Sequence, residues 1–388
     1  MTSKKIFPAF FIQFFILGFG GAIVGPLIPV LADFFKVRLD VIGTILSMNA
    51  FGILIATLFS GIVAERFGKK NIFIAGCILL IGSFLSIYFS SGLALFTAGY
   101  AIFGISLGMV QVNAISIISD FYLLNRSKML LRVLTGTSLG SFVVPGIVSI
   151  VLLKNINWKY IFLSIAILNT ALLIIMAALK ILGTGKTQEK EELKSLFIAN
   201  KNLFKSPIVI LCGVISFLHY GTNMAFSSWF TTYFKGQDVS VSKSSLLLSI
   251  YLFVFGMGMF LKSFVFTRFD EKKVMFYSSL LAFVFLFISI FTQHLAAKFI
   301  LILFFGFSFA AVGALALAAA IKQHQRYSGS VTSIIGSFGY TGVVVLQYLT
   351  GYLTENFSAS SMIYVSLASV FLMVILTSLL GHSKKMVN

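Results

Sequence analysis

Long apolar segments separated by short polar stretches run through the whole 388-residue chain. Each is about as long as the roughly 20 residues that a helix needs to cross a bilayer, and none alternates with the period of a membrane-barrel strand. The pattern predicts an all-α polytopic membrane protein with twelve transmembrane helices. We place them at residues 7–32, 41–63, 71–90, 93–119, 131–153, 158–180, 207–233, 243–266, 273–292, 297–321, 328–352 and 359–381.

The composition excludes a water-soluble globular protein. Apolar residues make up 59% of the chain and charged residues only 10%, whereas a soluble domain carries about 25% charged residues. The apolar run after Met1–Lys5 is too long for a cleaved signal peptide, so we expect the first helix to be retained. Cys77 and Cys212 both lie inside apolar segments, and we interpret them as packing residues.

The net charge of +18 indicates topology rather than nucleic-acid binding, because basic residues collect in cytoplasmic loops. With a cytoplasmic N-terminus, 22 of the 29 Lys and Arg residues fall on the inner side. We therefore expect a multi-pass protein of the cell (inner) membrane with both termini in the cytoplasm, whose partners include the lipid bilayer and no nucleic acid.

The chain divides near its midpoint at the hydrophilic stretch Gly183–Ser206. This predicts an N-terminal six-helix bundle (1–182), a cytoplasmic linker (183–206) and a C-terminal six-helix bundle (207–388). The halves are weakly similar: Glu65–Lys70 matches Thr267–Lys273, and a similar offset relates Gly136 and Gly140 to Gly336 and Gly339. Such parallel repeats occur in many secondary transporters, with the substrate site between them.

The segment Gly61–Lys70 reads G-I-V-A-E-R-F-G-K-K and resembles the major facilitator superfamily signature G-x-x-x-D-R-x-G-R-K. Glu65 stands where Asp is usual, and Lys69 replaces Arg. The resemblance covers the whole chain. It implies two pseudo-symmetric six-helix bundles and transport by alternating access.

Two further stretches resemble the fucose:proton symporter branch of that superfamily, including its TsgA-type members. One is the seventh predicted helix, with Tyr220–Asn223 followed by Ser228–Phe230 and Tyr233; the other is the fourth, with Gly104–Asn113. Sugar:proton symporters of this branch are expected to carry carboxylates in helices one and four. Here the apolar part of segment one contains no acid, and Gln111 and Asn113 stand near the fourth-helix position.

Ionisable residues at bilayer depth are functional candidates by default. All Asp and Glu residues lie at or beyond predicted helix ends, which leaves His219 as the titratable group near the midplane. With a reference pKa of about 6.5, His219 is either a substrate contact or proton carrier, or a packed histidine. We expect Lys262, close to a helix end, to extend its amine to the interface.

Neutral polar side chains within the spans form the candidate substrate site. Amides supply donors and acceptors, and an indole face can stack on a sugar ring, which favours a neutral, polyhydroxylated solute. Each residue could equally form an interhelical hydrogen bond. The predicted substrate-binding set is Asn49, Gln111, Asn113, His219, Asn223, Trp229, Tyr340 and Gln347.

The superfamily resemblance also implies a conformational latch on the inner side. Its acid, Glu65, is expected to engage the start of helix eleven near Ser328–Val331, and Arg66 or Lys70 is expected to reach Asp120. The alternative is a basic loop that only sets topology. The predicted latch residues are Gly61, Glu65, Arg66, Gly68, Lys70 and Asp120.

Glycine and proline are concentrated in some of the spans, and we interpret them as flexing or close-packing points for alternating access, with ordinary small-residue packing as the alternative. The first segment contains Gly18, Gly20, Gly21, Gly25, Pro26 and Pro29. Glycine lets helices approach one another, and proline removes a backbone hydrogen bond.

The sequence shows no phosphate-binding loop, no metal-ligand cluster and no catalytic set, so we expect neither an enzyme nor a cofactor or metal. We expect a small-molecule substrate and a monomeric transporter; the sequence does not decide whether transport is coupled to protons.

Two transport functions compete: import of a sugar-like solute and efflux of amphipathic compounds. Gly140–Gly146 only approximates the efflux signature G-x-x-x-G-P-x-x-G-G, which favours import. The 15% aromatic content could line a hydrophobic pocket, which favours efflux. A sensor without transport activity is a third alternative.

Overall fold

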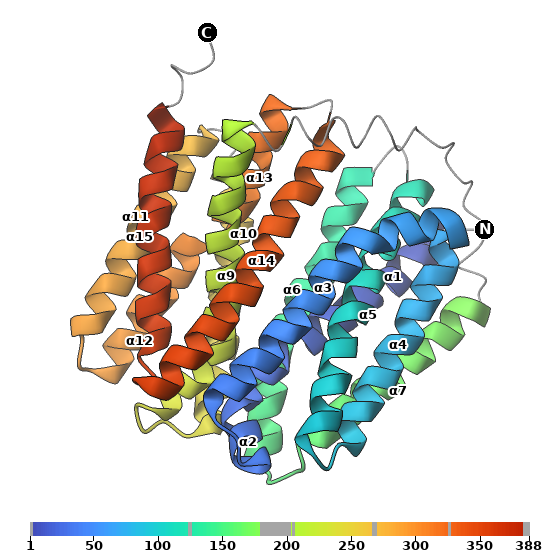
Figure 1. The fold of residues 1–388 in the computed structure, drawn as a ribbon, viewed down its shortest axis with the longest axis horizontal. Coiled ribbons are helices and arrows are strands. Elements are labelled where there is room, and N and C mark those ends of the chain that lie inside the picture. Colours follow the sequence, from blue (N-terminus) through green and yellow to red (C-terminus); the bar gives the residue numbers. More distant parts are fainter. Residues whose placement is uncertain are drawn as a thin grey trace. The chain divides into compact units, whose positions relative to one another are not determined.

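The computed structural model describes residues 3–122, 126–178, 203, 206–265, 270–324 and 327–382 as helices joined by short turns (Figure 1). No strand occurs among these residues, and the all-α prediction is confirmed. The helices are α1 (Ser3–Ala22), α2 (Val24–Phe35), α3 (Leu39–Phe67), α4 (Lys69–Phe89), α5 (Leu93–Phe121), α6 (Arg126–Leu153), α7 (Lys159–Ala178), α9 (Pro207–Lys235), α10 (Val241–Val265), α11 (Glu271–Phe291), α12 (Leu295–Phe309), α13 (Val312–Gln323), α14 (Ser328–Asn356) and α15 (Ser361–His382).

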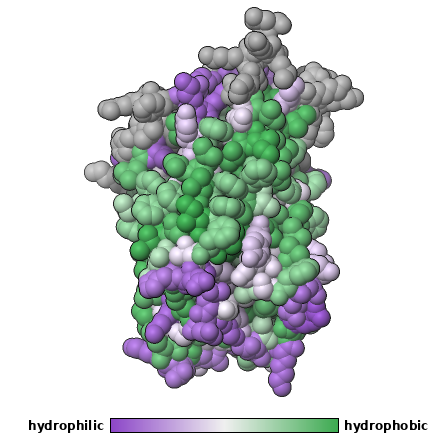
Figure 2. Space-filling model, turned by 90° about the vertical axis from the view of Figure 1, so that its left-hand side faces the viewer, coloured by the Kyte–Doolittle hydropathy of each residue, from purple (hydrophilic) through white to green (hydrophobic). Residues whose placement is uncertain are grey.

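Within this described part, eleven helical segments are long and apolar enough to cross a membrane, and the bent pair α1–α2 makes twelve if it counts as one span. α12 and α13 together form one of the eleven, Leu295–Gln323. This agrees with the predicted twelve. On the side where α11, α12 and α15 lie, hydrophobic residues cover the middle and hydrophilic residues gather toward the helix ends (Figure 2).

The first span bends by 41° between α1 and α2, around Ile23. Pro26 has no backbone N–H, so the carbonyl of Ala22 loses the donor that would continue the helix. The bend therefore lies within the run of glycines and prolines in the first segment, and the sequence explains it.

Residue contacts divide the chain into two compact units. The first contains α1 to α7 together with Phe230–Ser249, which is the end of α9 and the start of α10; the second contains the rest of α9 and α10 with α11 to α15. The predicted limits 1–182, 183–206 and 207–388 remain predictions. Most of the linker lies outside the described residues.

In the first unit, α1 packs along α6, and α5 packs against α3 and α4. The approach of α6 to α1 requires glycine: a Cβ at Gly140 would lie 2.2 Å from the carbonyl oxygen of Phe15. A Cβ at Gly18 would lie 2.0 Å from the carbonyl oxygen of Thr137. The small residues of these two helices therefore set their separation.

A buried polar network joins three helices of this unit. Nε2 of Gln13 on α1 donates to Oδ1 of Asn169 on α7 at 3.2 Å, and Nδ2 of Asn169 donates to the carbonyl oxygen of Cys77 on α4 at 3.2 Å. All three residues are fully buried. Each such bond contributes about 0.6 kcal/mol in a membrane bundle. The sequence analysis did not identify Gln13 or Asn169, although an amide inside an apolar span was the available signal.

An aromatic cluster anchors the end of α2 to the start of α7. Nζ of Lys159 lies 4.8 Å from the ring centroid of Phe34 and 5.7 Å from that of Trp158, and it donates to the carbonyl oxygen of Ser90. Trp158 also packs edge-on against Phe34, with the centroids 5.7 Å apart. Cation–π contacts and the hydrogen bond together hold this corner of the first unit.

In the second unit, α11 packs against α12 and α15, and α13 packs against α14. α9 and α14 approach through glycine, as α1 and α6 do: a Cβ at Gly342 would lie 2.0 Å from the carbonyl oxygen of Phe217. A Cβ at Gly221 would lie 2.5 Å from the carbonyl oxygen of Gly342.

These packing glycines refine the predicted repeat. Gly18 and Gly136 in the first unit and Gly221 and Gly339 in the second lie at one constant sequence offset, and all four are at close helix contacts. Gly336, which the sequence analysis paired with Gly136, has open space where a Cβ would be. By sequence offset, the counterpart of Gly136 among the packing glycines is therefore Gly339.

Candidate substrate site and loop motif

Polar groups without partners gather on α9 in the second unit. Thr222 is 1% exposed and Trp229 is fully buried. Oγ1 of Thr222, Oδ1 of Asn223 and Nε1 of Trp229 have no hydrogen-bond partner among the described residues. Buried polar atoms are normally paired, so each such atom calls for an explanation, and a bound ligand is one.

Gln347 of α14 contacts another face of α9. Its Nε2 donates to Oγ of Ser228 at 2.9 Å and to the carbonyl oxygen of Met224 at 3.3 Å, both on α9. Its Oε1 has no partner in the described part of the chain, although the residue is only 4% exposed. Two turns earlier, Tyr340 is half-buried on α14.

The structure thus places four of the predicted residues on one helix pair, α9 and α14. They are Asn223, Trp229, Tyr340 and Gln347. None is charged. Together the amides, the indole and the hydroxyl offer both donors and acceptors.

Three predicted residues lie instead on α3 and α5 in the first unit. Nδ2 of Asn49 donates to the carbonyl oxygen of Tyr100 at 2.7 Å, which ties α3 to α5. Nδ2 of Asn113 donates to Oγ of Ser60 at 2.6 Å, while its Oδ1 has no partner among the residues that the structure describes. Gln111 is half-buried. Asn49 therefore forms an interhelical hydrogen bond, which the sequence analysis gave as the alternative to substrate binding.

His219 lies in the packing between α9 and the tenth span. Its ring centroid is 4.6 Å from that of Phe309, and a Cβ at Gly313 would be 2.4 Å from its Cδ2. The residue is 4% exposed, and its Nδ1 has no partner in the described ranges. These contacts are compatible with packing; a role in substrate binding or proton coupling remains a prediction.

Lys262 on α10 does not extend its amine to the interface as expected. Nζ donates to the carbonyl oxygen of Ala310 at 2.8 Å and also to that of Ser308. The expectation fails because the neighbouring tenth span is broken between α12 and α13, and carbonyls at the break accept hydrogen bonds from Nζ.

The loop motif forms a tight turn between α3 and α4. Gly68 has φ 89°, a left-handed backbone conformation that favours glycine. Arg66 is exposed and lies over the ring of Phe67, 5.5 Å from its centroid. Gly61 has open space around it.

Asp120, at the end of α5, has Lys69 as its partner, with Nζ and Oδ2 2.8 Å apart. We expected Arg66 or Lys70 in this place. Lys69 is the first residue of α4, which packs along α5, whereas Arg66 lies on Phe67 and Lys70 is exposed. The side chains of Glu65 and of Ser328–Ser330 lie outside the described part of the structure.

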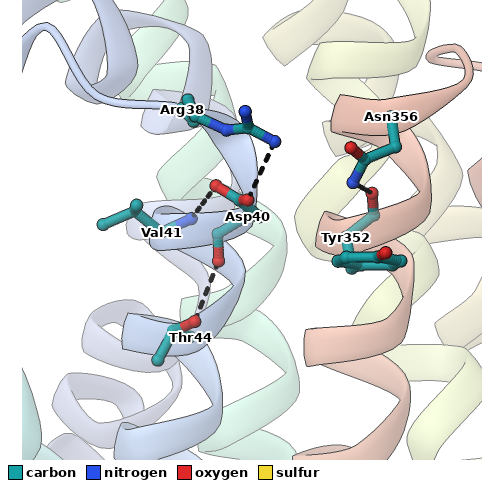
Figure 3. A network of polar contacts seen from close by, with 6 residues as sticks. All are labelled: Arg38, Asp40, Val41, Thr44, Tyr352 and Asn356. Atoms are coloured by element: carbon teal, nitrogen blue, oxygen red, sulfur yellow. Dashed lines mark hydrogen bonds and ion pairs between the residues drawn. The ribbon is translucent and has the colours of Figure 1, made fainter.

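Two other polar clusters fix helix ends (Figure 3). At the start of α3, Asp40 pairs with Arg38 at 3.2 Å and accepts from the backbone N–H of Val41 at 2.8 Å. Its carbonyl oxygen accepts from Oγ1 of Thr44. On α14, Nδ2 of Asn356 donates to the carbonyl oxygen four residues earlier. A carboxylate at a helix N-terminus is favourable, so Asp40 stabilises α3.

Comparisons with known proteins agree with this architecture. The family model described as Major Facilitator Superfamily matches residues 10–345 and residues 214–386. The Protein TsgA homolog of Buchnera aphidicola subsp. Baizongia pistaciae (strain Bp) is 24% identical over 380 residues, which cover 96% of this chain and 95% of that protein.

Two solved structures show the same fold. A D-xylose-proton symporter has a TM-score of 0.82 at 12% identity and covers 97% of each chain. The nucleoside transporter NupG has a TM-score of 0.77 at 14% identity and covers 98% of each chain. At these identities the likeness concerns the fold alone.

Proposed function

The chain belongs to the Major Facilitator Superfamily, and on that premise we propose that this secondary transporter moves a small, neutral, polyhydroxylated solute by alternating access. As a member of this superfamily it is a multi-pass membrane transporter and not an enzyme. The proposal concerns the chemistry of the substrate.

The observation that carries the proposal is the set of neutral, unpaired polar atoms on α9 and α14. Oδ1 of Asn223 and Oε1 of Gln347 can accept hydrogen bonds, and Nε1 of Trp229 can donate one. Hydroxyl groups both donate and accept, so a sugar-like solute suits neutral groups of both kinds. An ion would leave part of this set unpaired.

The printed names of the two similar structures suggest which solutes to test first. One is a D-xylose-proton symporter and the other a nucleoside transporter, and both solutes carry several hydroxyl groups. Efflux of amphipathic compounds remains the competing function.

The test is uptake by the purified full-length protein in proteoliposomes. Radiolabelled hexoses, fucose and nucleosides are offered with and without a proton gradient. Accumulation of one of them supports the proposal. Transport of an amphipathic dye, with no uptake of any polyhydroxylated solute, would overturn it.

We expect Gln347→Leu to raise the KM of the transported solute about tenfold, because one hydrogen bond of about 1.4 kcal/mol corresponds to that factor. Thr341→Val is the matched control on the same helix, since Thr341 is exposed and its hydroxyl donates to the carbonyl oxygen of Ser337 in its own helix. Equal KM values for the two variants would contradict the role of Gln347.

Proton coupling forms a separate part of the proposal. If the gradient drives accumulation, His219 is the first candidate, because it is the one His, Asp or Glu that the sequence places away from the helix ends within the spans. Unaltered coupling in His219→Ala would remove this candidate.

We also propose that the protein lies in the cell (inner) membrane as a monomer with both termini in the cytoplasm. The asymmetric distribution of Lys and Arg supports this orientation. Reporter fusions at Asn388 that are active only in the periplasm should be inactive.

A further inference from the structure

The tenth span is broken halfway along its length. α12 ends at Phe309 and α13 begins at Val312. Between them, Ala310 is extended with φ −54° and ψ 143°, and Ala311 has φ 73° and ψ −7°. A left-handed conformation is unfavourable for a residue with a Cβ, so surrounding contacts must hold the break open.

A break at this depth leaves main-chain carbonyls without their helical donors. Water is absent from the hydrocarbon core, so such carbonyls need partners within the protein. Here the partner is Lys262 of α10, whose Nζ donates to the carbonyl oxygens of Ala310, at 2.8 Å, and Ser308.

α10 is shaped to bring the ammonium group to the break. Gly258 lies one turn before Lys262 on the same face, and a Cβ there would be 2.6 Å from the carbonyl oxygen of Phe307. The aromatic ring of Tyr251 lies as close to Gly306, where a Cβ would be 2.5 Å from its Cε2. Close packing at these glycines places Lys262 within hydrogen-bond distance of α12.

The backbone carbonyl oxygens that bind the ammonium group of Lys262 are the same kind of ligand that a monovalent cation has at a broken helix. No carboxylate among the described residues forms an ion pair with it. Its neighbours are backbone carbonyls at a helix C-terminus, where the helix dipole is negative. In transporters with interrupted helices, unwound carbonyls of this kind coordinate the coupling cation.

We propose that the break in the tenth span is a cation-binding site that the chain fills with its own ammonium group, that of Lys262. The bound ammonium stabilises the left-handed conformation at Ala311 and so positions α12 relative to α13. When the side chain is removed, the same carbonyls bind a small primary ammonium ion from solution.

The experiment follows amide hydrogen exchange of the purified full-length protein, in peptides that cover residues 306–318. Lys262→Ala is expected to accelerate exchange in these peptides about tenfold, because the break loses its ligand and opens more often. Propylammonium, which replaces the deleted Cγ, Cδ, Cε and Nζ atoms, is expected to restore the wild-type rate. Tetramethylammonium, which has no N–H, is expected to have no effect.

Lys243→Ala is the matched control, since Lys243 is exposed in the first turn of the same helix. Unchanged exchange in Lys262→Ala, or equal rescue by both ammonium ions, would overturn the proposal. If Lys262→Ala does not accumulate, Lys262→Arg and Lys262→Met replace it. Arg is expected to keep the protection and Met to lose it; equal protection in both would contradict the cation site.

None of these measurements requires a transported substrate. Their failure would therefore leave the proposed substrate class untouched, and a failed uptake assay would leave the cation site untouched.

Discussion

Gly68 and Gly61 both belong to the signature segment, but only Gly68 has a backbone conformation that favours glycine. The first has φ 89°, whereas the second lies within α3 with open space where a Cβ would be. The same substitution at both positions therefore separates backbone strain from a general effect of losing glycine.

We expect Gly68→Ala to lower the free energy of unfolding by about 1 kcal/mol, because alanine is disfavoured at positive φ. Gly61→Ala should raise it by up to about 1 kcal/mol, since alanine is the better helix former. Thermal unfolding of the two purified variants measures the difference. Equal melting temperatures would show that the turn is not held at this φ.

The pair of Lys69 and Asp120 is partly buried, with side-chain exposures of 33% and 20%. A double-mutant cycle of Lys69→Met and Asp120→Asn is expected to give a coupling energy of about 0.5–1 kcal/mol in thermal unfolding. The same cycle with Arg66→Met in place of Lys69→Met should give a value near zero. Stronger coupling to Arg66 than to Lys69 would contradict the observed pairing.

At the level of helices, both units contain a helix pair in close backbone contact. α1 packs against α6, and α9 packs against α14, at distances that only glycine permits. In membranes such contacts replace the hydrophobic effect as a source of helix association, because lipid is as apolar as the side chains. The separation of these helix pairs is therefore sensitive to a single added methyl group.

Gly342→Ala places a Cβ 2.0 Å from the carbonyl oxygen of Phe217, so α14 must move away from α9. We expect a loss of about 1–3 kcal/mol in stability, as for other overpacked sites. Gly336→Ala on the same helix meets open space and should be tolerated. Thermal unfolding of both variants compares them directly, and equal stability would mean that the helices can separate without cost.

At the level of the whole molecule, the sequence was sufficient for the helical class and for the number of spans. Those features depend on the apolar content of long segments, which can be counted. The bend near Ile23 has a different signal in the sequence, because Pro26 lacks the backbone N–H that would continue the helix.

The details that the sequence analysis missed depend on neighbours in space. The break at Ala310 and Ala311 contains two alanines and carries no turn signal, so nothing indicated that Lys262 would find carbonyls nearby. The choice of Lys69 over Arg66 as partner of Asp120 depends on how α4 packs along α5. Of the candidate site, the residue types and the spans that carry them were predictable, but the hydrogen-bond partners of Asn49 and Gln347 required the structure.

The chain contains only two tryptophans, and they fall in different units: Trp158 in the aromatic corner of the first, and Trp229 in the interior of the second. Trp158→Phe would leave the indole of Trp229 as the one tryptophan reporter, on α9 of the second unit. The opposite replacement, Trp229→Phe, would leave a reporter next to Lys159. The natural sequence thus provides a separate optical probe for each half of the transporter without added dyes.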